Sequence, residues 1–480
     1  MTPHPLASEE PQPDPHVIVI FGGTGDLARR KILPGLFHLY LAGLLPERFR
    51  IIGVVRPPAE GSDDDFRQRV RDAVTEFGDG APSGEAWELF IASVSAVAAD
   101  ATHSTALVSA VDTAQKELGS DARRLYHLAV PPDATLELIA MLGATGLNEN
   151  ARVICEKPFG VDLASAKVLN ETIRANFHET QVFRIDHFLG KESIDNILAL
   201  RFANRLFEPL WNRDHICFVQ IDVPESITVA GRGAFYEETG AFRDMVVSHL
   251  FQVMGYLAME QPTSFEANPL RDEIHKVFQT TRPLDVANVV RGQYEGYRSE
   301  PGVAPDSNTE TFVALRVDID NTRWKGVPFY LRTGKGMAQR RQVITIGFEE
   351  TVMRLFPLAR GAHAWQGNRL VVDFDDPGSI HAHFLAKEPG PVMQLGEATM
   401  SFYYKDSFRH AHRLEAYEHL ILEAMLGNRA LFTRSDGIER LWEVAAPLLD
   451  DPPPVEPYPL GSWGPSSMER VVAPHGWCLP

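Results

Sequence analysis

Apolar runs alternate with helical patterns along the chain to about residue 190. Continuously apolar runs are typical of parallel strands covered on both faces, and they occur at residues 17–21, 51–55, 125–130 and 153–155. Between them, residues 64–118 are mostly helical in pattern, with glycine and proline breaks. This alternation predicts an α/β Rossmann-type dinucleotide-binding domain over residues 16–192.

A glycine-rich turn follows the first of these strands. Gly22, Gly23 and Gly25 allow the backbone to turn tightly and to approach a pyrophosphate. The helix expected after the turn contains Pro34, so either its first turns are irregular or its regular part begins near that proline. Strand, glycines and helix together predict a dinucleotide site at this edge of the sheet.

The second predicted strand ends at Arg56, where dinucleotide folds have the residue that contacts the adenine ribose. An acid at this position binds the ribose hydroxyls of NAD, whereas an arginine suits the 2′-phosphate of NADP. The strand end has Arg56 and no acid, which favours NADP. The alternative is an exposed loop arginine, and Pro57 and Pro58 after it leave little polar help for a phosphate.

The pattern changes in the second part of the chain. Residues 193–207, 242–258 and 414–426 have apolar positions at helical spacing. Strands are predicted at residues 216–223, 311–318, 327–332, 342–348 and 369–374. Several of these strands alternate apolar and polar residues, which is typical of a sheet with one wetter face. The pattern predicts a larger α+β domain over residues 193–480, with a mostly antiparallel sheet and helices on one face.

The two ends of the chain differ from the rest. Residues 1–15 are rich in proline and acid and have no apolar core, which predicts a disordered tail and not a signal peptide. Residues 451–480 are proline-rich and are expected to wrap the surface. No run approaches the ~20 apolar residues of a membrane span. The cysteines Cys155, Cys217 and Cys478 form no C-x-x-C motif, which indicates a reducing compartment and gives no metal signal. We therefore expect a cytoplasmic protein.

The formal net charge of the 480 residues is -18. A chain this acidic is a poor candidate for non-specific binding to nucleic acid or to an anionic membrane. An anionic substrate would therefore need a local basic pocket.

Residues 184–192, with the sequence R-I-D-H-F-L-G-K-E, follow a short apolar run. If the chain turns helical here, His187 and Lys191 lie on one face, and that pair suits a phosphate monoester. Taken alone, the stretch is more typical of a polar helix start than of a phosphate site. Glu156 and Lys157 stand at the end of the strand 153–155, where ligands bind in a doubly wound sheet.

Because it contains these motifs, the chain resembles the glucose-6-phosphate dehydrogenase family from about residue 17 to residue 449. R-I-D-H-x-L-G-K-E is very specific to that family. The other matching stretches are E-K-P-F-G at 156–160, L-R-F-A-N-R at 200–205, L-W-N-R-D at 210–214, G-R-G at 231–233, R-D-M at 243–245 with His249, and L-R-T-G-K at 331–335.

The resemblance implies oxidation of D-glucose 6-phosphate at C1 to 6-phospho-D-glucono-1,5-lactone with NADP, the first step of the oxidative pentose phosphate pathway. His249, paired with Asp186, is the implied general base. The implied substrate-binding residues are Lys157, His187, Lys191, Glu225, Asp244, Lys335 and Arg340. The implied cofactor-binding residues are Gly22, Gly23, Thr24, Gly25, Asp26, Leu27, Arg56 and Lys157. The resemblance also implies a homodimer or homotetramer built through the large sheet.

The chemistry explains why such residues are needed. Oxidation at C1 removes a hydride, which a nicotinamide accepts, and a proton, which requires a base with a pKa near working pH. An acid on the far ring nitrogen fixes the tautomer of the imidazole and stabilises the imidazolium. Neither a metal nor a covalent nucleophile is required. Without the resemblance, His249 would be interpreted as a core histidine and Lys335 as a loop lysine, and Glu225 and Asp244 would be indistinguishable from surface acids.

The chain departs from the family pattern at Phe188, where the family usually has a tyrosine that contacts the phosphate. Gly23 and Thr24 also replace the more usual Ala-Ser. Two alternatives remain open. One is another nicotinamide-dependent sugar oxidoreductase, of the glucose–fructose oxidoreductase type. The other is a sugar-phosphate sensor built on an enzyme scaffold that has lost its catalytic activity. The retained His249, Asp186 and Lys157 speak against the sensor.

Overall fold

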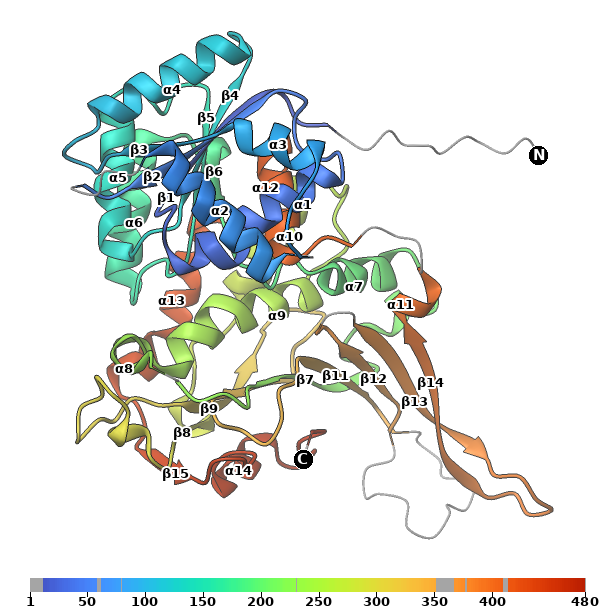
Figure 1. Ribbon diagram of the computed structural model, residues 1–480. Coiled ribbons are helices and arrows are strands. Elements are labelled where there is room, and N and C mark those ends of the chain that lie inside the picture. Colours follow the sequence, from blue (N-terminus) through green and yellow to red (C-terminus); the bar gives the residue numbers. More distant parts are fainter. Residues whose placement is uncertain are drawn as a thin grey trace, which may run out of the picture.

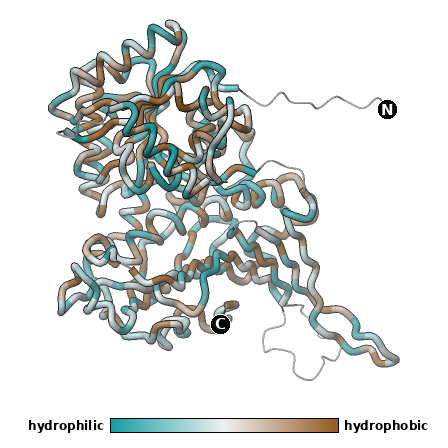
Figure 2. The backbone as a smooth tube through the Cα atoms, viewed as in Figure 1, coloured by the Kyte–Doolittle hydropathy of each residue, from teal (hydrophilic) through white to brown (hydrophobic). Residues whose placement is uncertain are grey.

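The computed structural model describes residues 12–57, 62–78, 80–229, 231–350, 367–375, 378–408 and 413–479. It contains two sheets, each with its own covering helices (Figure 1). Apolar residues concentrate along the central strands of both sheets (Figure 2). No helix in these ranges is both long enough and apolar enough to span a bilayer.

The strands of the first domain form a parallel sheet with the order β3-β2-β1-β4-β5-β6 among the described residues. Its strands are β1 (His16–Phe21), β2 (Phe49–Val55), β3 (Val94–Ala98), β4 (Arg123–Leu128), β5 (Ala151–Cys155) and β6 (Val182–Arg184). Side chains of β1 alternate between two cores, with Ile18 and Ile20 in one and Val17, Val19 and Phe21 in the other. Burial on both faces explains why the strand is continuously apolar, and the predicted Rossmann-type domain is confirmed.

Helices cover both faces of this sheet. One face packs against α1 (Leu33–Leu41), α2 (Asp63–Phe77), α3 (Glu85–Ala92) and α12 (Ala416–Leu426). The other packs against α4 (Thr105–Leu118), α5 (Pro132–Ala144) and α6 (Leu163–Asn176). Because α12 comes from the second part of the chain, the first domain is completed by residues that the sequence assigned to the larger one.

Three local predictions for the first domain are resolved by the structure. A π-helical turn, Ala28–Ile32, precedes α1, and Pro34 lies in the first turn of α1, as the proline required. The helical interpretation of residues 64–118 missed β3, a short strand between two helices. Residues 1–11 of the predicted tail lie outside the described residues. Pro13 is buried and Asp14 pairs with Arg123, so these two residues of the predicted tail pack against the first domain.

The larger sheet has the order β14-β13-β12-β11-β7-β10-β9-β8-β15 among the described residues. Its strands are β7 (Ile216–Pro224), β8 (Val289–Tyr294), β9 (Phe312–Asp318), β10 (Pro328–Gly334), β11 (Val343–Phe348), β12 (Arg369–Asp373), β13 (Ser379–Lys387), β14 (Leu395–Tyr403) and β15 (Val455–Tyr458). The pairs β7–β10 and β8–β15 are parallel and the other pairs are antiparallel, so the predicted mostly antiparallel sheet is confirmed. The hairpin β13–β14 extends away from the body (Figure 1).

Helices lie between this sheet and the first domain (Figure 1). They are α7 (Glu192–Phe202), α8 (Gly233–Ala241), the π-helix η4 (Phe242–Leu250) and α9 (Phe251–Ala258), with α10 (Ala267–Thr280) and α13 (Ser435–Asp450) beside them. The prediction that residues 451–480 merely wrap the surface was incomplete. β15 extends the sheet and Tyr458 is buried in the core, as is Val472 of α14 (Glu469–Val472).

Candidate active site

A cavity of about 660 Å³ lies where the first domain meets the helices of the second. Pro131 and Pro132, at the end of β4, and the loop after β5 form one wall, while η4 and the end of β10 form the other. The predicted site residues that line it are Lys157, His187, Glu225, Asp244, His249, Lys335 and Arg340. Residues from distant parts of the sequence therefore converge here, as the resemblance implied.

His249, which lines this cavity, forms a hydrogen-bonded pair with Asp186. The Nδ1–H of His249 donates to Asp186 Oδ1 at 2.5 Å, and the Phe188 amide donates to the same oxygen at 2.9 Å. Their side chains are 1% and 2% exposed. The His249 Nε2 has no hydrogen-bond partner among the described residues, and such an atom is costly to bury. The imidazole is thus held by one nitrogen while the other is left to accept a proton.

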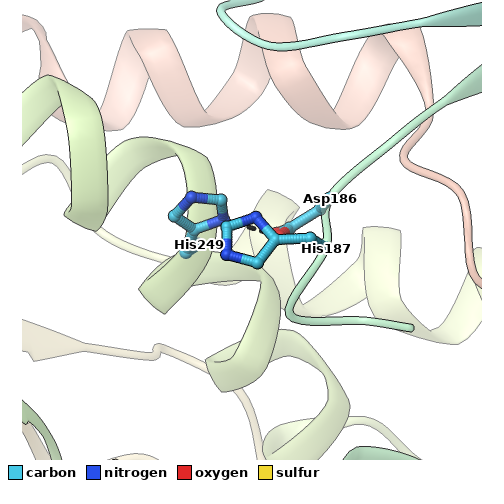
Figure 3. A group of neighbouring side chains, drawn as sticks. All are labelled: Asp186, His187 and His249. Atoms are coloured by element: carbon cyan, nitrogen blue, oxygen red, sulfur yellow. Dashed lines mark hydrogen bonds and ion pairs between the residues drawn. The ribbon is translucent and has the colours of Figure 1, made fainter. Parts of the chain in front are cut away.

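The two members of this pair come from different elements (Figure 3). Asp186 and His187 are consecutive residues just after β6, whereas His249 comes from η4. The rings of His187 and His249 lie edge to face with centroids 4.7 Å apart. The predicted approach of Asp186 and His249 across the two domains is confirmed.

The π-helical form of η4 aligns its polar residues. A π-helix has i→i+5 hydrogen bonds, so residues five apart share one face. Asp244 and His249 are five apart and both line the cavity, whereas in an α-helix they would diverge. An ordinary amphipathic helix was predicted over these residues, and the wider turn is a correction with a direct consequence for the site.

Lys157 is anchored to Asp244. Its Nζ donates to the Asp244 carboxylate at 2.7 Å and to the Asp244 carbonyl oxygen at 3.2 Å. Burial alone would raise the pKa of Asp244, but the Lys157 ammonium outweighs it and sets that pKa at about 2. Asp244 is therefore an anion at any working pH and keeps the ammonium over the cavity.

The loop that carries Lys157 is held to the second domain at two further points. The Trp442 Nε1–H donates to the Phe159 carbonyl at 3.0 Å, and the Arg243 Nε–H donates to the Val161 carbonyl at 3.0 Å. Neither Trp442 nor Arg243 was singled out from the sequence as a site residue. No local signal marks Trp442, since its partner lies 283 residues away in the chain.

The phosphate-binding pair predicted from sequence, His187 and Lys191, lines a second cavity. The chain does not turn helical between them, because it forms turns and α7 begins only at Glu192, with Lys191 as its N-cap. The Lys191 Nζ donates to Gln342 Oε1 and, at 3.3 Å, to the Phe374 carbonyl. Gln342 lines both cavities and was not predicted from the sequence.

Burial lowers the pKa of His187 well below its usual range, and His249, Lys157 and Lys191 add to the effect. His187 is therefore a neutral imidazole at working pH, able to donate one hydrogen bond. Its ring stacks on Tyr417, with centroids 6.5 Å apart. The Tyr417 hydroxyl donates to Glu156 at 3.1 Å. Tyr417, on α12, is a further residue that local sequence could not place here.

The remaining predicted substrate residues are paired with each other or with nearby acids. Lys335 directly follows β10, and its ammonium donates to the carboxylate of Glu225, which directly follows β7. Arg340 pairs with Asp375 at 2.9 Å. Phe188 is buried, with its ring edge to face against His249 at 4.5 Å. Phe188 also lines the cavity, and the Lys191 Nζ lies 5.2 Å from the centroid of its ring.

The glycine turn fits a dinucleotide phosphate. Gly22 has φ of +74°, and a Cβ there would lie 2.2 Å from the Ala129 carbonyl oxygen, so only glycine fits. Gly25 donates to the Gly22 carbonyl at 2.8 Å and closes the turn just before the π-helical turn. Thr24 and Asp26 are exposed, and Asp26 pairs with Arg30. The turn can therefore present backbone N–H groups to a phosphate, and binding of a cofactor by residues 22–27 stays a prediction.

Arg56 is exposed directly after β2, which pairs with β1. The carboxyl ends of these parallel strands meet at one edge, so Arg56 and the glycine turn share the region in which a cofactor would lie. Pro58 lies outside the described residues.

Asp186, His187 and His249 offer ligand atoms that all lie within 4.8 Å of one another, a spacing that a metal ion can also span (Figure 3). The hydrogen bond from His249 Nδ1 to Asp186 already uses one donor atom of each. A proton-transfer pair accounts for the same arrangement without a metal.

Comparison with known proteins finds the same relatives along the whole chain. A family model described as "Glucose-6-phosphate dehydrogenase, NAD binding domain" matches residues 19–196, and one described as "Glucose-6-phosphate dehydrogenase, C-terminal domain" matches residues 198–478. The glucose-6-phosphate 1-dehydrogenase of Treponema pallidum (strain Nichols) is 38% identical over 484 residues, covering 95% of this chain and 93% of its own. Glucose-6-phosphate 1-dehydrogenase 5, cytoplasmic, of Arabidopsis thaliana is 36% identical over 476 residues, covering 96% and 91%.

A solved structure of a glucose-6-phosphate dehydrogenase in complex with glucose-6-phosphate superposes with a TM-score of 0.90. It is 32% identical to this chain, and the match covers 98% of this chain and 100% of that one. The similarity thus extends through both domains and the cavity between them.

Proposed function

This chain belongs to the glucose-6-phosphate dehydrogenase family, and from that premise we propose that it oxidises D-glucose 6-phosphate at C1 to 6-phospho-D-glucono-1,5-lactone with NADP. The matches to both halves of the chain favour this reaction over that of another nicotinamide-dependent sugar oxidoreductase. The observation that carries the proposal is the buried His249–Asp186 pair, with a free Nε2 at the wall of a cavity ringed by Lys157, Lys335 and Arg340.

His249 is the base in this proposal. Its Nε2 takes the proton of the C1 hydroxyl, and Asp186 keeps Nδ1 protonated and stabilises the imidazolium that results. Because both side chains are almost fully buried, their attraction is weakly screened by solvent.

In this proposal, charged and neutral polar groups hold the substrate. His187, Lys191 and Arg340 bind the phosphate, and a neutral His187 donates its N–H without adding a charge. Glu225, Asp244 and Lys335 bind the sugar hydroxyls, with Lys157 between sugar and nicotinamide. Phosphate binding far from C1 orients the reacting carbon toward His249.

NADP, when bound, supplies the hydride acceptor. The turn at residues 22–27 holds its pyrophosphate through backbone N–H groups, and Arg56 holds its 2′-phosphate. The loop carrying Lys157, which is anchored to η4 and α13, fixes the distance between the cofactor domain and the base.

We propose a cytoplasmic homodimer or homotetramer, by analogy with the relative named as cytoplasmic and with the family's assembly through the large sheet. The extended hairpin β13–β14, with Met400 and Tyr403 exposed, supports contacts through this sheet. The partition into a tail, a cofactor domain over residues 16–192 and a larger domain over residues 193–480 is part of the same proposal.

The test is to mix purified protein with NADP or NAD and a panel of sugar phosphates and free sugars, and to follow nicotinamide reduction. Rapid reduction with glucose 6-phosphate and NADP is expected, with weaker turnover of free glucose. Faster reduction with another sugar, or no reduction with any of them, would contradict the proposal.

A further inference from the structure

The π-helix η4 carries two residues of the proposed site, Asp244 and His249, and a residue from a distant segment holds its N-terminus. The N–H of Phe242, the first residue of η4, donates to Glu310 Oε1 at 3.0 Å. The N–H of Ala241 donates to the Glu310 carbonyl oxygen at 2.9 Å. The first N–H groups of a helix have no partner within it, so Glu310 satisfies two of them and places a negative charge at the positive end of the peptide dipoles.

Glu310 is itself fixed to the larger sheet. Its Oε2 accepts two hydrogen bonds from Arg291 of β8, at 3.1 Å from Nε and 2.7 Å from Nη2. The side chains of Glu310 and Arg291 are 6% and 11% exposed. Thr311, the next residue, donates its N–H to the Gly292 carbonyl at 2.8 Å. The carboxylate therefore joins the sheet to η4 in surroundings that screen its charge weakly.

The same short segment also holds Lys335, a third residue of the cavity. The Thr311 carbonyl accepts the backbone N–H of Lys335 at 2.8 Å. Consecutive residues, Glu310 and Thr311, thus anchor both η4 and the backbone that carries the Lys335 ammonium. The placement of this ammonium relative to Asp244 and His249 depends on that connection.

The backbone before η4 is shaped to admit the carboxylate. Gly240, within α8, has φ of +66° and ψ of 169°, which are not helical values, so the chain is kinked directly before η4. A Cβ at Gly240 would lie 2.4 Å from Glu310 Oε1, so a side chain there would displace the carboxylate. Because of the kink, the regular turns of α8 do not set the rotation of η4 about its axis.

We propose that Glu310 is a positioning residue for the proposed reaction, since its bond to the Phe242 N–H fixes the rotation of η4 so that Asp244 and His249 both face the cavity. A helix that slips by one residue turns by about a quarter of a turn, which moves both side chains off the cavity wall. Glu310 does not line the cavity and acts through η4. The inference rests on the proposed function, because it takes His249 as the base and Asp244 as the anchor of Lys157.

The test compares two double variants that both lack the ion pair. Removing Glu310 alone would leave the buried Arg291 guanidinium unpaired, which destabilises the fold by itself. In an Arg291→Met chain, Glu310→Gln keeps an oxygen that accepts the Phe242 N–H, whereas Glu310→Ala removes it. The double variant with Glu310→Ala should have a kcat about 10- to 100-fold below that of the one with Glu310→Gln, the range for a catalytic group misplaced by up to about 1 Å.

Two measurements separate positioning from loss of stability. A kcat deficit caused by partial unfolding shrinks when the assay temperature is lowered further below Tm, whereas a misoriented η4 keeps its deficit. Amide hydrogen exchange over residues 241–250 needs no turnover, and it should be faster with Glu310→Ala than with Glu310→Gln. Asp222→Asn, at the buried pair with Arg332 outside the cavity, is the matched control. It should lower Tm without a comparable loss of kcat and without faster exchange over these residues.

Equal kcat values in the two double variants, a deficit that disappears at low temperature, or equal exchange rates would overturn the inference. Should the double variant with Glu310→Ala not fold, Glu310→Asp takes its place. It keeps a carboxylate for Arg291 but withdraws it from Phe242 by one methylene, so kcat should fall and exchange should rise, and parental values of both would overturn the inference. A chain whose exchange responds as expected but which does not oxidise glucose 6-phosphate would overturn only the proposed function.

Discussion

Replacing Asp186 with asparagine removes the charge that faces His249 while keeping the shape of the site. Asp186 Oδ1 accepts bonds from His249 Nδ1 and from the Phe188 amide, and an asparagine oxygen can accept both. What is lost is the attraction between the carboxylate and the imidazolium formed when His249 takes the substrate proton. With charge centres about 4 Å apart and an effective dielectric constant of about 20, that attraction is about 4 kcal/mol. A barrier raised by this amount corresponds to a roughly thousandfold lower kcat.

The assay is steady-state NADPH formation from glucose 6-phosphate. Asp186→Asn should lower kcat by about that factor and change KM far less, because the charge acts mainly in the transition state. His249→Asn should cause a loss of similar or greater size, and the double variant should lose little more, since the pair acts as a unit. Asp222→Asn is the matched control. Asp222 is a fully buried carboxylate bonded to Arg332 at 2.6 Å outside the cavity, so its loss should lower the free energy of unfolding without a comparable loss of kcat.

A folded Asp186→Asn protein whose kcat stays within about tenfold of the parent's would refute the role of this charge, because such a loss is below the range expected for acid–base catalysis. A near-normal kcat in His249→Asn would have the same effect. His187 would then be the leading candidate for the base, because its ring lies beside that of His249. Circular dichroism and thermal unfolding of each variant separate loss of catalysis from loss of fold.

Further predictions concern the cofactor, the phosphate, the domain junction and pH. Arg56→Ala should weaken NADP binding about 10- to 150-fold and leave NAD nearly unchanged in steady-state kinetics, and equal losses would contradict the assignment. Phe188→Tyr should lower KM for glucose 6-phosphate and barely change KM for free glucose, whereas a parallel fall in both would place the phosphate elsewhere. Trp442→Phe should lower kcat/KM about fivefold through the lost hydrogen bond to the Lys157 loop, while Trp324→Phe, which loses the equivalent bond to the Ala258 carbonyl, should not. Burial lowers the pKa of His16 from 6.5 to about 4 in the folded protein. As the pH falls below 6.5, His16 is therefore protonated in the unfolded chain before it is protonated in the folded one. The free energy of unfolding should therefore fall by about 3 kcal/mol as pH drops through that window, and His16→Gln should flatten the dependence seen in urea titrations.

Much of the first domain was determined by local sequence. Apolar runs such as residues 17–21 are buried on both faces of a parallel sheet, and only glycine fits the φ and the close approach at Gly22. The apolar run and the glycines after it lie within a few residues and are readable without the fold, whereas the carbonyl that Gly22 approaches belongs to Ala129 on a distant segment. The motif at residues 184–192 likewise predicted the residues proposed to bind the phosphate, although it did not predict their turn conformation.

Only the tertiary structure decided how the site is assembled. Asp186 reaches His249 across 63 residues, and η4 aligns His249 with Asp244 because its turn is π-helical, a choice that amphipathic spacing does not encode. Tyr417 arrives on α12, which packs into the core of the other domain through apolar contacts that any amphipathic helix could make. Periodicity specifies which face of an element is buried, whereas the partner of that face depends on contacts between distant segments. The sequence therefore supplied the chemical groups and the fold class, and long-range packing set the distances at which those groups can act.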